Sequence, residues 1–266
     1  MLIEAQELMI SPPQVIFDCR FSLADPRAGR ARYDEGHIPG AYYLDLDLDL
    51  SGDTAAHGGR HPLPLAGDFV ALLTSYGVNK DTEVVAYDDA RFAFASRLWW
   101  LMRSLGYRPP RLLNGGYQAW LSAGGEVEMA VNSPGIRPAA EPARFGSWCD
   151  IDELRALQQR GALLVDSREE RRYQGLEEPI DPIAGHIPGA INRPWQAVTS
   201  AEGKLREAAD LRAHWGDVLE AEQLVVYCGS GVTACVNIFS LALLGREDAT
   251  LYAGSWSDWC SYLTVD

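Results

Sequence analysis

The sequence lacks any run of about 18 apolar residues, the length that a membrane-spanning helix needs. Its N-terminal segment MLIEAQELMI also lacks the basic and long apolar stretches of a secretion signal, so we expect a cytoplasmic protein. Basic side chains are in the minority, with 23 lysines and arginines against 37 acidic residues and a formal net charge of −14. Because a nucleic-acid binder needs a basic surface, we expect neither nucleic acid nor a membrane as a partner.

Cysteine is scarce, and its pattern excludes two classes of site. The chain has no CxxC pair, and an odd, widely spaced set of cysteines does not form a disulfide framework. No group of cysteines and histidines has the spacing of a zinc site, so we expect no bound metal. Free thiols in a reducing compartment fit this composition. The five cysteines are Cys19, Cys149, Cys228, Cys235 and Cys260.

A long internal repeat is present instead. The hexapeptide GHIPGA occurs at Gly36–Ala41 and again at Gly185–Ala190. Three further pairs of segments occur in the same order in both halves, and a period this long indicates a duplicated domain rather than a solenoid. These pairs are 15–20 with 163–168, 84–88 with 224–228, and 114–120 with 253–259. We predict a first domain over 1–130, a linker rich in Pro, Gly and Ala over 131–147, and a second domain over 148–266.

Short apolar runs alternate with helical patterns in both halves. This is typical of an α/β fold in which helices cover both faces of a parallel sheet. The expected strands are 15–18, 83–88 and 111–115 in the first half, and 163–167, 224–228 and 249–254 in the second. A capping-box pattern at Asp150–Glu153 predicts a helix over 150–159. Two more helices are expected over 93–105 and 232–244, each followed by a glycine at the position of a C-cap.

Cys228 ends one of these apolar strands and begins a glycine-rich loop. The loop residues that follow it are Gly229, Ser230, Gly231, Val232 and Thr233. Two glycines let the backbone curl so that its N–H groups point inward, and the next helix adds positive potential at its N-terminus. Both features stabilise a thiolate or a persulfide. A cysteine after an apolar strand is more often buried and inert, but this loop favours a reactive nucleophile. The other four cysteines have no such loop and are assigned to the core.

The segment Cys228–Cys235 reads CGSGVTAC, which resembles the active-site loop of the 3-mercaptopyruvate sulfurtransferases in the rhodanese superfamily. With both GHIPGA motifs and the tandem halves, the resemblance covers nearly the whole chain. It implies two tandem rhodanese-like domains, each a parallel sheet flanked by helices, with one active site in the C-terminal half. The N-terminal half would be non-catalytic, because Asp88 stands where the repeat places Cys228.

The resemblance also implies a role for particular residues. Cys228 matches the nucleophile, and Arg172 matches an arginine that binds the carboxylate of the donor. A guanidinium suits this role because its planar fork binds a carboxylate through two parallel hydrogen bonds. The loop backbone from Gly229 and Gly231 to Val232 and Thr233 would help to bind the substrate. Some relatives carry a second arginine shortly before GHIPG, and this sequence has none in that segment.

Some members of the family have a proposed serine, histidine and aspartate relay for protons. Ser230, His61 and Asp47 match these positions, although Asp45 and Asp49 are close enough to compete with Asp47 for the assignment. Without the resemblance, His61 would be interpreted as a histidine in a surface loop.

The resemblance implies ping-pong transfer of sulfur through a persulfide on Cys228, with release of pyruvate and no metal or organic cofactor. The donor is expected to be 3-mercaptopyruvate, because relatives that prefer thiosulfate usually carry basic residues where this chain has Gly229 and Ser230. The acceptor would be a thiol or cyanide, and a thioredoxin-like protein is one candidate.

Three alternatives remain open from the sequence. One is a sulfurtransferase that prefers thiosulfate, and another is a non-catalytic persulfide carrier or binding module. The third is a cysteine phosphatase or arsenate reductase, whose loop needs an arginine at the position of Ala234 and is therefore disfavoured.

Overall fold

The computed structural model describes residues 1–263, and the chain forms two compact units. The first unit consists of residues 1–52, 63–146 and 199–205. Within the described residues, the second consists of residues 53–62, 147–198 and 206–263. The short segment 53–62 therefore belongs to the second unit although it lies early in the sequence. The domain boundaries expected from the sequence remain predictions.

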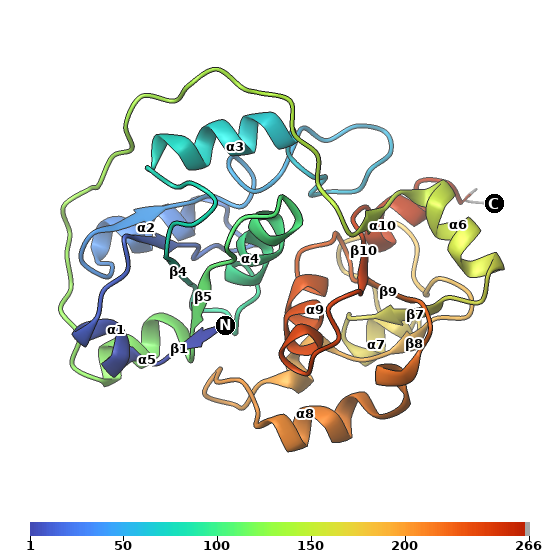
Figure 1. The fold of residues 1–266 in the computed structure, drawn as a ribbon. Coiled ribbons are helices and arrows are strands. Elements are labelled where there is room, and N and C mark those ends of the chain that lie inside the picture. The colour runs from blue at the N-terminus through green and yellow to red at the C-terminus, as the bar shows by residue number, and fades with distance from the viewer. Residues whose placement is uncertain (264–266) are drawn as a thin grey trace. The chain divides into compact units, whose positions relative to one another are not determined.

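A five-stranded parallel sheet forms the centre of the first unit, with the strand order β1-β5-β4-β2-β3 (Figure 1). The strands are β1 (Leu2–Ile3), β2 (Val15–Asp18), β3 (Ala41–Tyr43), β4 (Val84–Tyr87) and β5 (Arg111–Leu113). Every residue of β2 and β4 is buried, as expected for inner strands of a parallel sheet that is covered on both faces.

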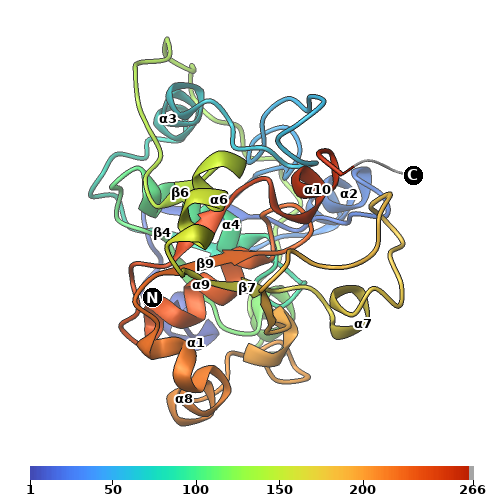
Figure 2. The ribbon, with the colours of Figure 1, turned by 90° about the vertical axis from the view of Figure 1, so that its right-hand side faces the viewer.

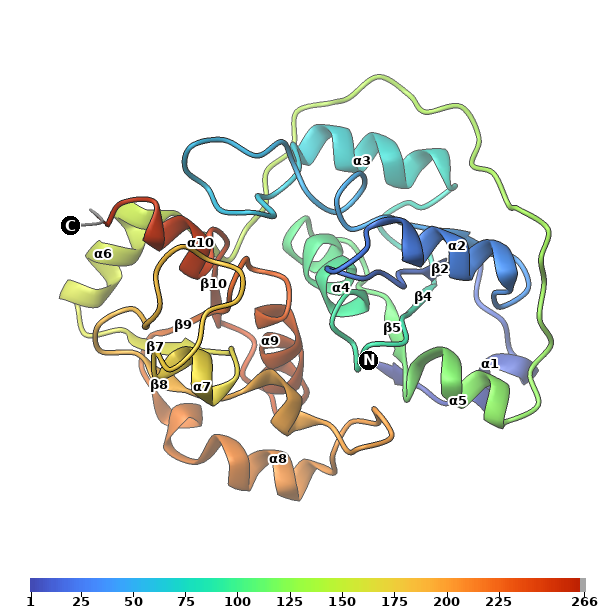
Figure 3. The same ribbon diagram turned by 180° about the vertical axis from the view of Figure 1, so that it is seen from behind.

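Five helices surround this sheet. They are α1 (Ala5–Ile10), α2 (Arg27–Glu35), α3 (Ala66–Ser75), α4 (Ala95–Ser104) and α5 (Gly116–Ser122). Helices α1 and α5 cover one face, where Leu8 and Trp120 join Ile16 and Val85 in one apolar cluster. Figures 1 and 3 show α3 and α4 on the opposite side of the strands.

The second unit contains a five-stranded parallel sheet of the same design, with the order β6-β10-β9-β7-β8. Its strands are β6 (Trp148–Cys149), β7 (Leu163–Asp166), β8 (Ile191–Asn192), β9 (Leu224–Tyr227) and β10 (Thr250–Tyr252). Each sheet is ordered first, fifth, fourth, second and third along its own unit. The predicted fold class, two tandem domains with parallel sheets, is confirmed.

The second unit has five α-helices and two 3₁₀ helices within the described residues (Figure 2). They are α6 (Ile151–Gln159), α7 (Glu170–Tyr173), η1 (Trp195–Val198), α8 (Ala208–Trp215), η2 (Gly216–Glu220), α9 (Ala234–Leu243) and α10 (Ser255–Cys260). Leu154 of α6 and Trp256 of α10 pack with Val225 and Tyr227 of β9 on one face of the sheet. Helix α9 follows β9 and is buried along almost its whole length.

The histidine of each GHIPGA motif makes the same contacts in its own unit. Nδ1 of His37 lies 2.7 Å from the carbonyl oxygen of Tyr33, and Nδ1 of His186 lies 2.8 Å from that of Tyr173. Each imidazole also stacks on the ring of the same tyrosine. Because both units use the histidine alike, its role is structural in both.

The structure confirms the capping box at the start of α6, where the Asp150 side chain accepts backbone N–H groups. The predicted starts of α4 and α9 were each two residues too early. Helix α9 begins at Ala234 because Gly231 turns the loop with a φ of 77° just before it. Gly106 and Gly245 follow these two helices with positive φ, as predicted for C-cap glycines.

Within residues 1–263, no helix has the length and apolarity that crossing a membrane would require. Residues 132–146 contain no helix or strand.

Candidate active site at Cys228

Cys228 lies directly after β9 and is held by the start of α10. The residue is only 2% exposed. Its N–H donates to Oγ of Ser255 at 3.1 Å, and its carbonyl accepts the N–H of Trp256 at 3.0 Å. The next carbonyl, that of Gly229, accepts the N–H of Ser257 at 2.9 Å. The backbone around the sulfur is therefore fixed on its carbonyl side.

Unlike these carbonyl groups, most backbone N–H groups of the same loop have no hydrogen-bond partner within the described residues. Within the described residues, the amides of Gly229, Ser230, Val232 and Thr233 donate no hydrogen bond. Gly231 has a φ of 77°, and a Cβ there would lie 2.3 Å from the carbonyl oxygen of Ala253. Helix α9 starts just beyond, where the amides of Cys235 and Val236 already donate to the carbonyls of Val232 and Thr233, so the helix adds the positive end of its dipole rather than free amides. Unpaired amides at a helix start form a site of positive potential that suits an anion.

The corresponding loop of the first unit shows what such amides can hold. Asp88 occupies the position of Cys228, and its carboxylate accepts four backbone N–H groups. The donors are Ala90 at 2.8 Å, Phe92 at 3.1 Å, Phe94 at 2.9 Å and Ala95 at 2.9 Å. Burial raises the pKa of Asp88, and these amides oppose that rise. This loop design therefore directs backbone N–H groups at the oxygens of a carboxyl group.

Arg172 extends from the short helix α7 and lies beside the Cys228 loop. A Cβ on Gly229 would be 3.5 Å from Nη2 of Arg172, so the absent side chain gives the guanidinium access to the backbone. Two buried carboxylates hold this arginine. Nη2 donates to Glu178 at 2.6 Å and to Asp181 at 3.3 Å, and Nε donates to Glu178 at 3.2 Å.

Arg60 is a second guanidinium at the loop, and no sequence motif predicted a role for it. Its Nη2 would lie 3.1 Å from a Cβ on Gly229. Burial lowers the pKa of Arg60, while the neighbouring charge of Cys228 raises it. The side chain forms an ion pair with Asp181. The position of Arg60 beside the Cys228 loop depends on tertiary packing, which the sequence does not reveal. The only sequence signal for a role of Arg60 was that it directly precedes His61.

His61 lies beside the loop as well. Its Nδ1 is 2.7 Å from Oγ of Ser230, and both residues are buried. The segment that carries His61 is attached to α10 within the second unit. The N–H of Gly58 donates to Asp258 at 2.7 Å, and the N–H of Arg60 donates to Ser257 at 3.1 Å.

Asp47, the third predicted member of the relay, belongs to the first unit. It lies in a turn after β3, where its N–H donates to Oδ1 of Asp45 at 2.9 Å. Burial raises its pKa, and the charge of Asp45 adds to that rise. The structure thus brings Cys228, Ser230 and His61 together with Arg172 in one unit, and the part of Asp47 in a relay stays a prediction.

The remaining cysteines are free and buried, and the five cysteines form no disulfide. Burial raises the pKa of Cys149 to about 12 and that of Cys260 to about 11, so both are held as neutral thiols. Among residues 1–263, no group of three or more His, Cys, Asp or Glu side chains is arranged to hold a metal ion.

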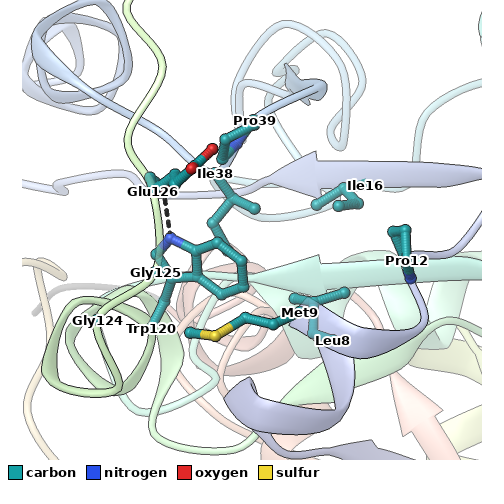
Figure 4. A pocket seen from close by; sticks show the side chains of 10 residues that line it. All are labelled: Leu8, Met9, Pro12, Ile16, Ile38, Pro39, Trp120, Gly124, Gly125 and Glu126. Atoms are coloured by element: carbon teal, nitrogen blue, oxygen red, sulfur yellow. Dashed lines mark hydrogen bonds between the residues drawn. The ribbon is translucent and has the colours of Figure 1, made fainter.

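A cavity of about 460 Å³ in the first unit offers no comparable chemistry (Figure 4). Its walls are mainly apolar, with Leu8, Met9 and Ile16 around the ring of Trp120. The indole N–H of Trp120 donates to the carbonyl of Glu126 at 2.7 Å. Its lining contains no cysteine, serine or histidine, so it lacks a nucleophile for sulfur transfer.

Comparisons with known proteins agree with this geometry. A family model for the rhodanese-like domain matches residues 2–123 and 150–262. A probable 3-mercaptopyruvate sulfurtransferase of Pseudomonas aeruginosa is 41% identical over 97% of this chain and 94% of its own length. A putative thiosulfate sulfurtransferase of Mycobacterium tuberculosis, SseB, is 39% identical over 98% of this chain and 94% of its own. The solved 3-mercaptopyruvate sulfurtransferase from Leishmania major is 32% identical, with a TM-score of 0.85 over 97% of this chain and 74% of that one.

Proposed function

This chain belongs to the rhodanese family, and on that premise we propose that it is a sulfurtransferase that carries sulfur as a persulfide on Cys228. The donor is 3-mercaptopyruvate and the product is pyruvate. One observation carries the proposal. The loop at Cys228 leaves four amides without a partner in the described chain, while the same loop in the first unit surrounds the carboxylate of Asp88.

The reaction needs one bond to form and one to break. The thiolate of Cys228 attacks the sulfur of the donor, an S–S bond forms, and the C–S bond breaks. Its electron pair leaves with the three-carbon fragment as the enolate of pyruvate. The proton lost from the donor thiol ends on the methyl carbon of pyruvate, so the sulfur stays on Cys228 as a persulfide anion. The unpaired amides of the loop would stabilise both the thiolate and this anion.

Ser230 and His61 are suited to move that proton. The 2.7 Å separation between Ser230 Oγ and His61 Nδ1 is a hydrogen-bond distance, which a proton carrier requires. We assign Ser230 as the group nearest the reacting sulfur and His61 as its partner, with Asp47 as the third member. The backbone of Gly229, Gly231, Val232 and Thr233 completes the donor site.

The choice of donor rests on the groups around the loop. Ser230 and Gly229 add no positive charge next to the sulfur, and the charges of Arg60 and Arg172 are countered by Glu178 and Asp181. A dianion such as thiosulfate gains little from a locally neutral cluster. A planar carboxylate can still form paired hydrogen bonds with a guanidinium fork.

The persulfide is then taken by a thiol or by cyanide, and a thioredoxin-like protein is the candidate protein acceptor. We place the reaction in the cytoplasm, because five free cysteines suit a reducing compartment.

Treatment of the purified protein with 3-mercaptopyruvate tests the proposal. We expect intact-mass spectrometry to show about 32 Da added, on a peptide containing Cys228, with release of pyruvate. Cys228→Ser should give neither signal, whereas Cys260→Ala should give both. Sulfur on another cysteine, or persulfide without pyruvate, would contradict the assignment. Parallel kcat/KM values for thiosulfate would test the donor preference.

A further inference from the structure

One acidic side chain of α10, that of Asp258, contacts the segment that carries His61. Its Oδ1 accepts the N–H of Gly58 at 2.7 Å, three residues before His61 in the sequence. His61 in turn places its Nδ1 2.7 Å from Oγ of Ser230. The start of α10 also binds the backbone of Cys228 through two hydrogen bonds. The helix therefore fixes the loop that carries the nucleophile and, through Asp258, the segment that carries the histidine.

The carboxylate of Asp258 is itself fixed by a buried tyrosine. Its Oδ2 accepts the hydroxyl of Tyr252 at 2.6 Å, and Asp258 is only 4% exposed. Burial raises the pKa of Tyr252, and the hydrogen bond to Asp258 adds to that rise, so the hydroxyl stays protonated and donates. Each carboxylate oxygen thus has its own partner, one from β10 and one from the His61 segment. Asp258 links the two.

The first unit shows that this fold forms without such a carboxylate. The repeat places Ala119 where the second unit has Asp258, and Leu113 where it has Tyr252. Helix α5 nevertheless forms and packs on its own sheet. A buried polar pair carries a desolvation cost that an apolar pair avoids, so the fold alone does not account for it. The Asp258–Tyr252 pair is specific to the unit that contains Cys228 and the His61 segment.

Two further contacts join this segment to the C-terminal part of the chain, and both use hydroxyl groups. The N–H of Arg60 donates to Oγ of Ser257 at 3.1 Å, and Nδ1 of His57 lies 2.7 Å from Oγ of Ser261 at an exposed contact. Hydrogen bonds to a charged acceptor are about twice as strong as bonds between neutral groups. The buried carboxylate of Asp258 is therefore the strongest of these anchors.

We propose that Asp258 is a positioning residue for sulfur transfer, which holds His61 at hydrogen-bond distance from Ser230 through the backbone of Gly58. This inference rests on the proposed function and deepens it, because Ser230 and His61 carry the proton in that reaction. A hydrogen bond weakens steeply when its two groups move apart or lose their alignment. Release of Gly58 from its anchor would therefore separate His61 from Ser230. Asp258 acts through the segment rather than on the donor itself.

Two substitutions of Asp258 differ in whether Gly58 keeps an acceptor. Asp258→Ala removes both oxygens, and we expect kcat for 3-mercaptopyruvate to fall by about 10- to 100-fold, the lower end of what positioned proton transfer contributes. Asp258→Asn keeps one oxygen for Gly58 and can turn its amide nitrogen toward the Tyr252 hydroxyl, so it should retain most of the wild-type kcat. In deuterium exchange, the Gly58 amide should exchange at least about tenfold faster in Asp258→Ala, because a hydrogen bond to a charged group is worth that factor.

Two variants of Tyr252 separate this effect from a loss of stability. Tyr252→Phe leaves the bond between Asp258 and Gly58 in place, so its kcat should stay near the wild-type value. The double variant Tyr252→Phe/Asp258→Ala removes both partners of the buried pair, as Leu113 and Ala119 do in the first unit. It leaves neither side chain unsatisfied and should fold even where Asp258→Ala does not. We expect it to show the full loss of kcat.

A double-mutant cycle with His61 shows whether Asp258 acts through that histidine. His61→Gln should lower kcat, and adding Asp258→Ala should lower it no further, because both changes remove one function. Losses of kcat that multiply would overturn the inference, as would unchanged Gly58 exchange in a folded Asp258→Ala variant. A wild-type protein that forms no persulfide on Cys228 would instead contradict the proposed function, and the exchange rates would still show whether Asp258 anchors the segment.

Discussion

The loops that follow β4 and β9 occupy the same position in their units, but a side chain accepts the backbone amides of only the first loop. In the first unit, the Asp88 carboxylate occupies the loop and accepts four amides. In the second, Cys228 stands at that position, and the loop amides within the described residues are left without partners at four positions. A loop that is filled by its own side chain is stable and inert. A loop that is left open can bind the sulfur of a substrate.

The same contrast extends to the arginine of each unit. Arg32 precedes Tyr33 as Arg172 precedes Tyr173, and its Nη1 pairs with Asp89 at 2.9 Å. Gly229 stands where the first unit has Asp89, so the second unit places no carboxylate of its own there. The first unit thus fills both positions with its own chain. In the second unit Arg172 pairs with Glu178 and Asp181 instead, and we propose that the open loop receives the sulfur anion and the carboxylate of the donor.

The largest effect is expected when the aspartate of the loop after β4 is placed at the corresponding position of the loop after β9. We expect Cys228→Asp to lower sulfur transfer by at least about 1000-fold, because the nucleophile is gone and a carboxylate takes up the amides. Its stability to urea should equal or exceed that of Cys228→Ala, which leaves the amides open. Comparison of the two variants by pyruvate release and by denaturation checks both statements. A Cys228→Asp variant less stable than Cys228→Ala would show that this loop does not receive a carboxylate as the first one does.

The reverse test empties the first loop. Asp88→Ala leaves four backbone donors without an acceptor, so we expect the first unit to lose at least about 4 kcal/mol of stability, since each unsatisfied group costs about 1–3 kcal/mol. Asp88→Asn keeps an acceptor oxygen and should lose less. Urea denaturation monitored by tryptophan fluorescence measures the effect. Turnover by the folded variants should stay near the wild-type value, and a large loss of kcat there would mean that Asp88 does more than fill its loop.

Both sheets and the loop at Cys228 could be predicted from the sequence. The repeated motifs and the apolar runs of β2, β4, β7 and β9 specify two parallel sheets, because buried parallel strands have few polar residues. The glycines after Cys228 identified its loop. The two-residue edge strands β1 and β6 carry too little pattern to be recognised. Arg60 was missed for a different reason. Its place beside the loop depends on how residues 57–61 attach to α10, and sequence spacing carries no record of that packing.

The smallest expected effect concerns the geometry of the open loop rather than its charge. Gly231 and Gly245 both have positive φ, but only at Gly231 would an added Cβ meet another atom within 4 Å, the carbonyl oxygen of Ala253 at 2.3 Å. Gly231→Ala should therefore shift the loop and lower kcat/KM by about tenfold or more, since small misplacements of reacting groups are costly. Gly245→Ala should cost about 1 kcal/mol of stability through its φ alone and leave kcat/KM unchanged. Steady-state kinetics on the matched pair separates the two effects. Equal kcat/KM values for both variants would mean that the close approach of Gly231 to Ala253 does not set the position of the amides around Cys228.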